Sequence, residues 1–141
     1  MAFSHRQRAV LPLNMRENSE LMVITKAKDI VNYSFVVAEN APKKYRFTLI
    51  TRIHNTALDV LENLIFANEI MLTTDLHDRA ERCGYQRKAL AGLKVLDALA
   101  MTARERQCIL PKQYENLSRL IYECVKLLKA WQRSDERRMG I

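Results

Sequence analysis

The sequence predicts an all-α protein, an antiparallel up-down-up-down four-helix bundle, and three observations lead to this prediction. Only three Gly and three Pro occur in 141 residues, whereas all-β folds use many such residues in their tight turns. Apolar residues recur at helical spacing in four long segments. The Pro residues at 42 and 111 fall between segments, where helices end or begin. The length points to one domain, and a hydrophobic content of 48% is enough to form its core.

The first helix is expected over about residues 20–40, after a flexible basic tail over residues 1–18. Basic residues occur in this tail without helical periodicity. From residue 21 onward, apolar residues follow one another at intervals of three and four, as is typical of an amphipathic helix. They include Leu21, Ile24, Val31, Phe35 and Ala38. Pro42 ends this helix because a Pro disfavours the helical conformation of the residue before it.

The second helix is expected over about residues 43–72, and it carries two apolar stripes rather than one. The main stripe is Leu49, Ile53, Ala57, Val60, Leu64, Ala67 and Met71, and the second is Phe47, Ile50, His54, Leu58, Leu61 and Ile65. Together they are wider than the groove between two helices requires. A monomeric bundle cannot cover both stripes, so we expect the second stripe to form the interface of a homo-oligomer.

The third and fourth helices are expected over about residues 75–106 and 111–138, which extends the bundle over residues 19–139. Thr73 or Thr74 is the expected N-cap of the third helix. Pro111 marks the start of the fourth, because the first turn of a helix tolerates Pro. Apolar residues of the fourth helix follow a heptad pattern: Tyr114, Leu117, Ile121, Cys124, Leu128 and Trp131. Short connections between the four segments favour the antiparallel arrangement.

The positive charge of the chain predicts a nucleic-acid-binding surface. The net charge is +7, and such an excess favours polyanions. In a bundle of alternating helices, the first and third connections lie at the same end. Six cations are therefore expected to converge there: Lys43, Lys44, Arg46, Arg104, Arg106 and Lys112. Outward positions seven residues apart add Arg87 and Lys94 on the third helix, and Arg119 and Lys126 on the fourth.

We expect these cations to contact RNA or DNA mainly through phosphates, because no motif indicates base-specific readout. The alternative is that they only keep an exposed helix face solvated. Aromatic residues on the apolar stripes, among them Phe35, Phe47, Tyr114 and Trp131, are expected to pack in the protein rather than to stack on bases.

Several other classes of function are disfavoured. Three Cys without C-x-x-C spacing argue against a disulfide framework or zinc site and fit a cytoplasmic protein. No apolar run approaches the ~18 residues of a membrane span. A di-iron bundle needs Glu-x-x-His pairs, and nucleotide-binding enzymes need glycine motifs, which this chain lacks. We expect no catalytic site, metal or cofactor. His54, on the second stripe, is expected to be a hydrogen-bonded imidazole in the core or at the interface.

Two segments resemble a known family. The run Lys44-Tyr45-Arg46-Phe47, followed by Asn55-Thr56-Ala57-Leu58 and Asn68, is similar to the second helix of one four-helix-bundle family. The Leu-Leu-x-x-Trp-x-x-Ser pattern at the end of the fourth helix resembles the close of the same family. This family contains the accessory variability determinant (Avd-like) proteins of diversity-generating retroelements and the intervening-sequence proteins encoded within bacterial large-subunit rRNA genes. The resemblance covers about residues 20–138.

The resemblance implies a homopentameric barrel with a basic surface that associates with nucleic acid. In the retroelement branch it also implies a partner reverse transcriptase, which copies a template RNA with errors at adenines while the accessory protein remains non-enzymatic. An intervening-sequence protein of unknown role is the alternative. A helical toxin-type ribonuclease is a further alternative from another class. Those enzymes require an Arg-x4–6-His motif, which the spacing of Arg46 and Arg52 from His54 does not provide.

Overall fold

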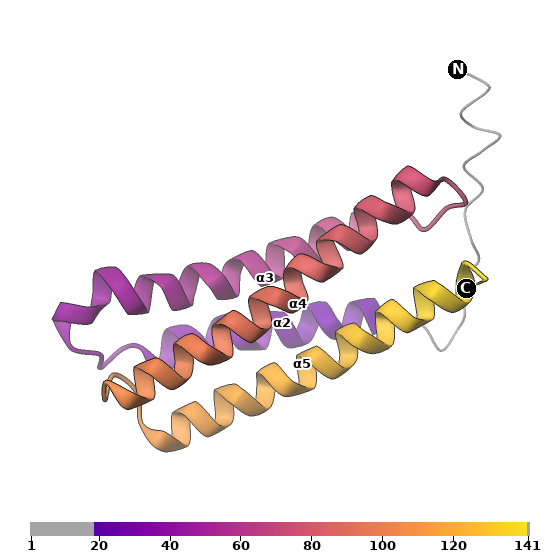
Figure 1. The fold of residues 1–141 in the computed structure, drawn as a ribbon. Helices are drawn as coiled ribbons and strands as arrows, with labels where there is room; N and C mark the ends of the chain where they lie inside the picture. The colour runs from indigo at the N-terminus through magenta and orange to yellow at the C-terminus, as the bar shows by residue number, and fades with distance from the viewer. Residues whose placement is uncertain (1–18, 141) are drawn as a thin grey trace.

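The computed structural model describes residues 19–140, with side chains from residue 21 (Figure 1). This part of the chain contains four long α-helices and no strand, which confirms the all-helical class. The helices are α2 (Ser19–Val37), α3 (Thr51–Glu69), α4 (Leu76–Glu105) and α5 (Pro111–Arg138). A 3-10 turn, η1 (Lys43–Tyr45), and a π-helical turn, η2 (Arg46–Ile50), precede α3. The basic tail expected over residues 1–18 lies outside the described residues.

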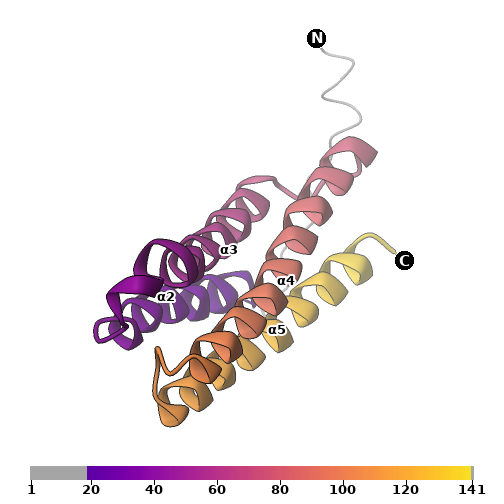
Figure 2. The same ribbon diagram turned by 60° about the vertical axis from the view of Figure 1, so that its left-hand side comes forward.

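The four helices form a square bundle in which consecutive helices run antiparallel. Helix α2 packs against α3 and α5, and α4 packs against the same two helices. Figure 2 shows α2 and α3 on one side of the bundle and α4 and α5 on the other. The α2–α3 groove and the α4–α5 groove therefore lie on opposite faces. The connection into α3 and the connection between α4 and α5 share one end of the bundle, as the alternating direction requires (Figure 1).

The core follows the helical periodicity of the sequence. On α5 the heptad positions are buried as expected, from Leu117 to Trp131. They pack with buried residues of the other helices, including Ile30, Leu64, Leu93 and Leu96. Cys124 lies in this core, where loss of hydration of the thiolate raises the pKa of its thiol to about 12.

The start of α3 differs from the expected continuous helix, and one interface prediction, that of Ile50, is corrected by the structure. In a π-helix each residue is rotated about the helix axis by a smaller angle than in an α-helix. Over the five residues of η2, side-chain directions therefore shift by roughly a quarter of a turn from those of a regular α-helix. Ile50 was expected at a subunit interface, but its side chain is 5% exposed and belongs to the core of its own chain. Phe47 leaves the second stripe and lies beside Leu99 and Thr102 of α4.

The ends of α4 are closed by residues that the sequence analysis did not select. Asp75, rather than Thr73 or Thr74, is the N-cap, because its carboxylate accepts from the backbone N–H groups of His77 (2.7 Å) and Asp78 (3.3 Å). At the C-terminus, Gln107 adopts φ 60°. The N–H of Cys108 then donates to the carbonyl of Ala103 at 2.8 Å. This is a Schellman turn, built here without glycine.

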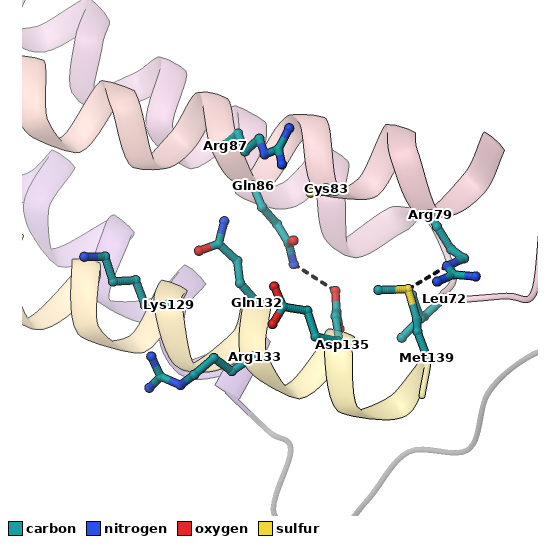
Figure 3. Close-up of a pocket in the computed structure, with 11 residues that line it drawn as sticks. Leu72, Arg79, Cys83, Gln86, Arg87, Lys129, Gln132, Arg133, Asp135 and Met139 are labelled. Carbon is teal, nitrogen blue, oxygen red and sulfur yellow. Dashed lines mark hydrogen bonds between the residues drawn. The ribbon is translucent and has the colours of Figure 1, made fainter. Parts of the chain in front are cut away.

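A buried ion pair joins α4 to α5 at the end opposite η1 and η2. The guanidinium of Arg82 donates to both carboxylate oxygens of Asp135, at 2.7 and 3.0 Å, and to the carbonyl of Ile70 at 2.8 Å. The amide of Gln86 donates to Asp135 at 2.9 Å (Figure 3). The Arg82 guanidinium also lies 5.0 Å from the centroid of the buried Trp131 ring. The ion pair thus fixes α4, α5 and the end of α3 together.

Candidate nucleic-acid interface

The structure brings cations of two separate connections together at one end of the bundle. Lys44 in η1 and Arg106 at the end of α4 are both exposed. Both lie close enough to the Cys108 thiol to oppose the rise in its pKa that burial causes. Lys43 and Arg46 are also exposed, on either side of Lys44. These four residues, Lys43, Lys44, Arg46 and Arg106, are called the basic end below.

Two other cations expected at this end lie on its α5 side. The Arg104 guanidinium is 5.7 Å from the centroid of the Tyr114 ring on α5. The Lys112 ammonium lies 3.8 Å from the carboxylate of Glu115, and both side chains are exposed. An exposed pair of this kind is worth at most about 1 kcal/mol, so it leaves Lys112 free to change partner. The six predicted cations therefore share one end but form two groups.

A second group of cations borders the α4–α5 groove. Arg87 of α4 lines a pocket with Lys129 and Arg133 of α5 (Figure 3). Nearer the basic end, Lys94 lines a shallow depression with Tyr122. These cations, together with Lys126, whose ammonium lies 5.1 Å from the Tyr122 ring centroid, are called the basic face: Arg87, Lys94, Lys126, Lys129 and Arg133.

Lys129 was not among the predicted nucleic-acid-binding residues, and Arg119 lies apart from the others. Lys129 is absent from the series of basic residues spaced by seven, but it follows Lys126 by three positions and therefore lies on the same side of the helix. Arg119 faces the α2 side of α5, 3.4 Å from the carboxylate of Glu123. Glu123 also pairs with Lys26 of α2 at 3.0 Å, and this hydrogen bond lowers the pKa of its carboxyl group.

The opposite face, along the α2–α3 groove, is apolar. On α3 the side chains of Leu58 and Ile65 are exposed and Leu61 is half-buried. Sequence reasoning found these three but did not assign two exposed residues of α2, Leu21 and Phe35, to this face; the Phe35 ring stacks on His54 of α3. We call these five residues, Leu21, Phe35, Leu58, Leu61 and Ile65, the apolar face. Acidic residues of α3, Asp59 and Glu62, border it.

His54 is engaged within its own chain on this side of α3. Its imidazole stacks on the ring of Phe35, with 4.0 Å between the ring centroids. Its Nε2 lies 3.3 Å from the carbonyl oxygen of Ser34, which can only accept a hydrogen bond. The expectation of a hydrogen-bonded imidazole is thus met by a partner on α2.

The described residues show neither a metal centre nor a membrane span. Over residues 19–140 there is no group of three or more His, Cys, Asp or Glu side chains placed to hold a metal ion. None of the described helices has an apolar stretch long enough to cross a bilayer.

Comparison with known proteins gives two similarities. A family model described as bAvd-like matches residues 21–135. The crystal structure of a protein of unknown function from the S23 ribosomal protein family of Bacteroides thetaiotaomicron is similar with a TM-score of 0.63. That similarity covers 79% of this chain and 96% of the other, at 22% sequence identity, and it shows a shared fold. Comparison with curated proteins gave no match.

Proposed function

We propose, from the premise that this chain belongs to the bAvd-like family, that it is a non-enzymatic accessory protein of a diversity-generating retroelement. In this role it binds RNA or DNA and associates with a reverse transcriptase to support mutagenic cDNA synthesis. One observation carries the proposal: an apolar face and a basic face lie on opposite sides of the same bundle. A protein that holds nucleic acid while it assembles with other subunits needs both.

The basic end and the basic face support binding to a polyanion. Lys and Arg release counterions when they neutralise phosphates, so each contact contributes to affinity without reading the sequence. Within residues 19–140, the side chains of Arg46 and Arg106 have no ion-pair partner. They can therefore contact phosphates without first breaking an internal ion pair.

The apolar face supports self-association. A contiguous apolar patch on a soluble protein marks a surface that another protein covers. Leu58, Leu61 and Ile65 border a depression on α3, so a helix of a second copy can pack against it by ridges-into-grooves packing. The number of subunits that we propose, five, comes from the family resemblance.

The placement of His54 favours a non-enzymatic role over a toxin-type ribonuclease. A general base must reach the reacting group together with its cationic partner. His54 faces Phe35 on α2, whereas Arg52 lines a groove on the α4 side of α3. If the purified protein cleaves RNA and His54→Ala abolishes the cleavage, the non-enzymatic proposal is wrong.

Fluorescence anisotropy with labelled RNA at two salt concentrations tests nucleic-acid binding. We expect affinity to fall steeply with salt and to depend little on sequence. Replacing Lys43, Lys44 and Arg46 together by Glu should weaken binding at least tenfold, or about 1.4 kcal/mol. Lys88→Glu is the control, because Lys88 is exposed on α4 but lies over Tyr85, outside the basic end and the basic face.

Two results would redirect or contradict the proposal. If the triple variant binds normally while Arg119→Glu combined with Lys126→Glu does not, α5 carries the contact rather than the basic end. If none of these variants loses affinity, the charges do not bind nucleic acid. Co-purification with the reverse transcriptase, tested with the same triple variant, then decides whether the basic end contacts that enzyme instead.

A further inference from the structure

Phe47 is the most exposed large apolar side chain in the described part of the chain. It is 90% exposed, although it lies between the half-buried Tyr45 and Leu49. It borders an open groove formed by η1, η2, the first turn of α3 and the last turns of α4. The groove is lined by Tyr45, Phe47, Thr48, Leu49, Thr51, Arg52, Asn55, Leu99, Thr102 and Arg106. Packing within the chain therefore does not account for this aromatic ring.

The π-helical turn is the element that turns Phe47 outward. A regular α-helix would place Phe47 on the side of His54 and Leu58, on the apolar face. The wider turn of η2 carries it to the α4 side instead. The carbonyl of Arg46 accepts two hydrogen bonds from Thr51. One comes from the backbone N–H, which closes the turn, and the other comes from the side-chain hydroxyl at 2.6 Å. π-Turns of this kind occur frequently at functional sites.

The groove around Phe47 is positively charged and can form hydrogen bonds. Arg52 and Arg106 line it from α3 and α4, and no acidic residue lines it. Within residues 19–140 neither guanidinium has an ion-pair partner. Asn55 adds an exposed amide, and Thr102 an exposed hydroxyl that already donates to the carbonyl of Ala98 at 3.0 Å and can still accept a hydrogen bond. An aromatic face surrounded by unpaired cations and hydrogen-bonding groups is the arrangement that proteins use for single-stranded nucleic acid.

From this arrangement we infer that the groove binds an unpaired base of single-stranded RNA or DNA, stacked on Phe47, with the adjacent phosphates held by Arg52 and Arg106. The inference rests on the proposed function and adds to it a preference for single strands. In a duplex the faces of the bases are covered by their neighbours and cannot stack on a protein side chain, whereas an unpaired base can. Charge alone does not make this distinction, because both forms carry phosphates.

The test compares a short fluorescein-labelled single-stranded RNA with the duplex of the same sequence. Phe47→Ala should weaken single-strand binding by about fivefold to a hundredfold and leave duplex binding within about twofold. Phe47→Tyr should retain single-strand binding because it keeps the aromatic face. Leu110→Ala is the control, since Leu110 is a second exposed apolar residue at this end, 64% exposed and outside the groove.

A spectroscopic measurement reports stacking directly. The only Trp of the chain, Trp131, is buried. In a Phe47→Trp variant, we expect bound single-stranded RNA to quench the fluorescence of the new indole, and the wild type to show no comparable quenching.

Several results would overturn the inference. Unchanged binding by Phe47→Ala, or an equal loss for single strand and duplex, would reject base stacking while the proposed function stands. A fall in the molecular mass of Phe47→Ala by light scattering would show instead that Phe47 packs between copies of the chain. If the wild type binds no nucleic acid at all, the proposed function fails together with the inference.

Discussion

The α2–α3 half and the α4–α5 half of the bundle are both antiparallel helix pairs, yet they leave opposite chemistry at the surface. Along the α2–α3 groove the uncovered side chains are those of the apolar face, with acidic residues of α3 beside them. Along the α4–α5 groove they include five Lys and Arg residues of the basic face, together with the exposed Tyr122 and Glu136. Lys and Arg outnumber Asp and Glu on α4 and on α5, whereas the reverse holds on α3 and the two kinds are equal in number on α2.

The contacts between the two helices of each pair also differ, since one pair is joined by aromatic rings and the other by charged groups. The stacked rings of Phe35 and His54 join α2 to α3, whereas the buried ion pair of Arg82 and Asp135 joins α4 to α5. Two helix pairs with the same antiparallel packing can therefore present surfaces of opposite chemistry. An apolar groove gains free energy when another protein covers it, and a cationic groove gains it when a polyanion replaces its counterions.

The largest effect is expected at the ion pair of the α4–α5 half. Arg82→Ala leaves the Asp135 carboxylate buried without its main partner, which should lower the free energy of unfolding by about 3–5 kcal/mol. Urea denaturation followed by circular dichroism measures this loss. The double variant Arg82→Met, Asp135→Leu is the matched control, and it should recover a part of the stability because the two buried charges are removed together. The recovery should be incomplete, since Arg138, whose side chain is 10% exposed, also loses its contact with Asp135 at 3.8 Å. If the single variant is as stable as the wild type, the ion pair does not hold this half together.

The next effect concerns the apolar face. Leu58→Asp places a charge in the proposed subunit interface and should weaken self-association by at least about a hundredfold, or ~2.7 kcal/mol. Light scattering should then approach the mass of one subunit, 16.4 kDa, while circular dichroism remains helical because Leu58 is already exposed. Val95→Asp is the control, since Val95 is comparably exposed on α4. A wild type that is monomeric at micromolar concentration would contradict this prediction.

A smaller effect is expected on the basic face. Replacing Lys94, Lys126 and Lys129 together by Gln removes three cations without adding repulsion. Affinity for single-stranded RNA should fall about tenfold, and the slope of log K against log salt should become shallower by about 2. Anisotropy titrations at several salt concentrations measure both. An unchanged slope would place the phosphates at the basic end alone.

The smallest effect uses Cys83 as a reporter of the basic face. Cys83 is partly exposed and lies in the pocket with Arg87 and Lys129 (Figure 3), so bound RNA should slow its alkylation by iodoacetamide a few-fold. The other two thiols should stay unlabelled at pH 8, since burial raises the pKa of Cys108 and raises that of Cys124 to about 12, well above this pH. Mass spectrometry identifies the labelled residue. Equal labelling of Cys83 with and without RNA would contradict binding at this pocket.

The same pKa of Cys124 has a consequence for stability. The folded state keeps the proton of this thiol up to about pH 12, whereas an unfolded thiol loses it near pH 8.5. The contribution of the protonated Cys124 thiol to the free energy of unfolding is therefore fully present below pH 8.5. It decreases as the pH rises from about 8.5 toward 12. Both halves of the bundle share this core thiol, so alkaline pH should destabilise them together.

The periodicity of apolar residues was sufficient to predict the four helices and most of the core. It predicted the buried positions of α5 because heptad spacing places them on one side of any regular helix. The same logic found Leu58, Leu61 and Ile65 on one side of α3, and it placed Lys43, Lys44 and Arg46 at the same end as Arg106.

Sequence periodicity could not place residues whose position depends on a change of helical phase, and it could not find contacts between residues that are distant in sequence. Phe47 lies on the α4 side rather than beside His54 because the π-helical turn shifts the phase before α3, whereas the spacing of apolar residues assumes a constant angle per residue. Ile50 ends this turn three residues before the buried Ile53, so it joins the core at ordinary helical spacing. The Arg82–Asp135 pair joins residues of two helices that are remote in sequence. Likewise, Phe35 belongs to the apolar face only because α2 packs beside α3 and brings its ring onto His54. The sequence determined which face of each helix is apolar or charged, because that follows from local geometry. The tertiary structure decided which of these faces meet and which remain uncovered, because that depends on how the helices pack.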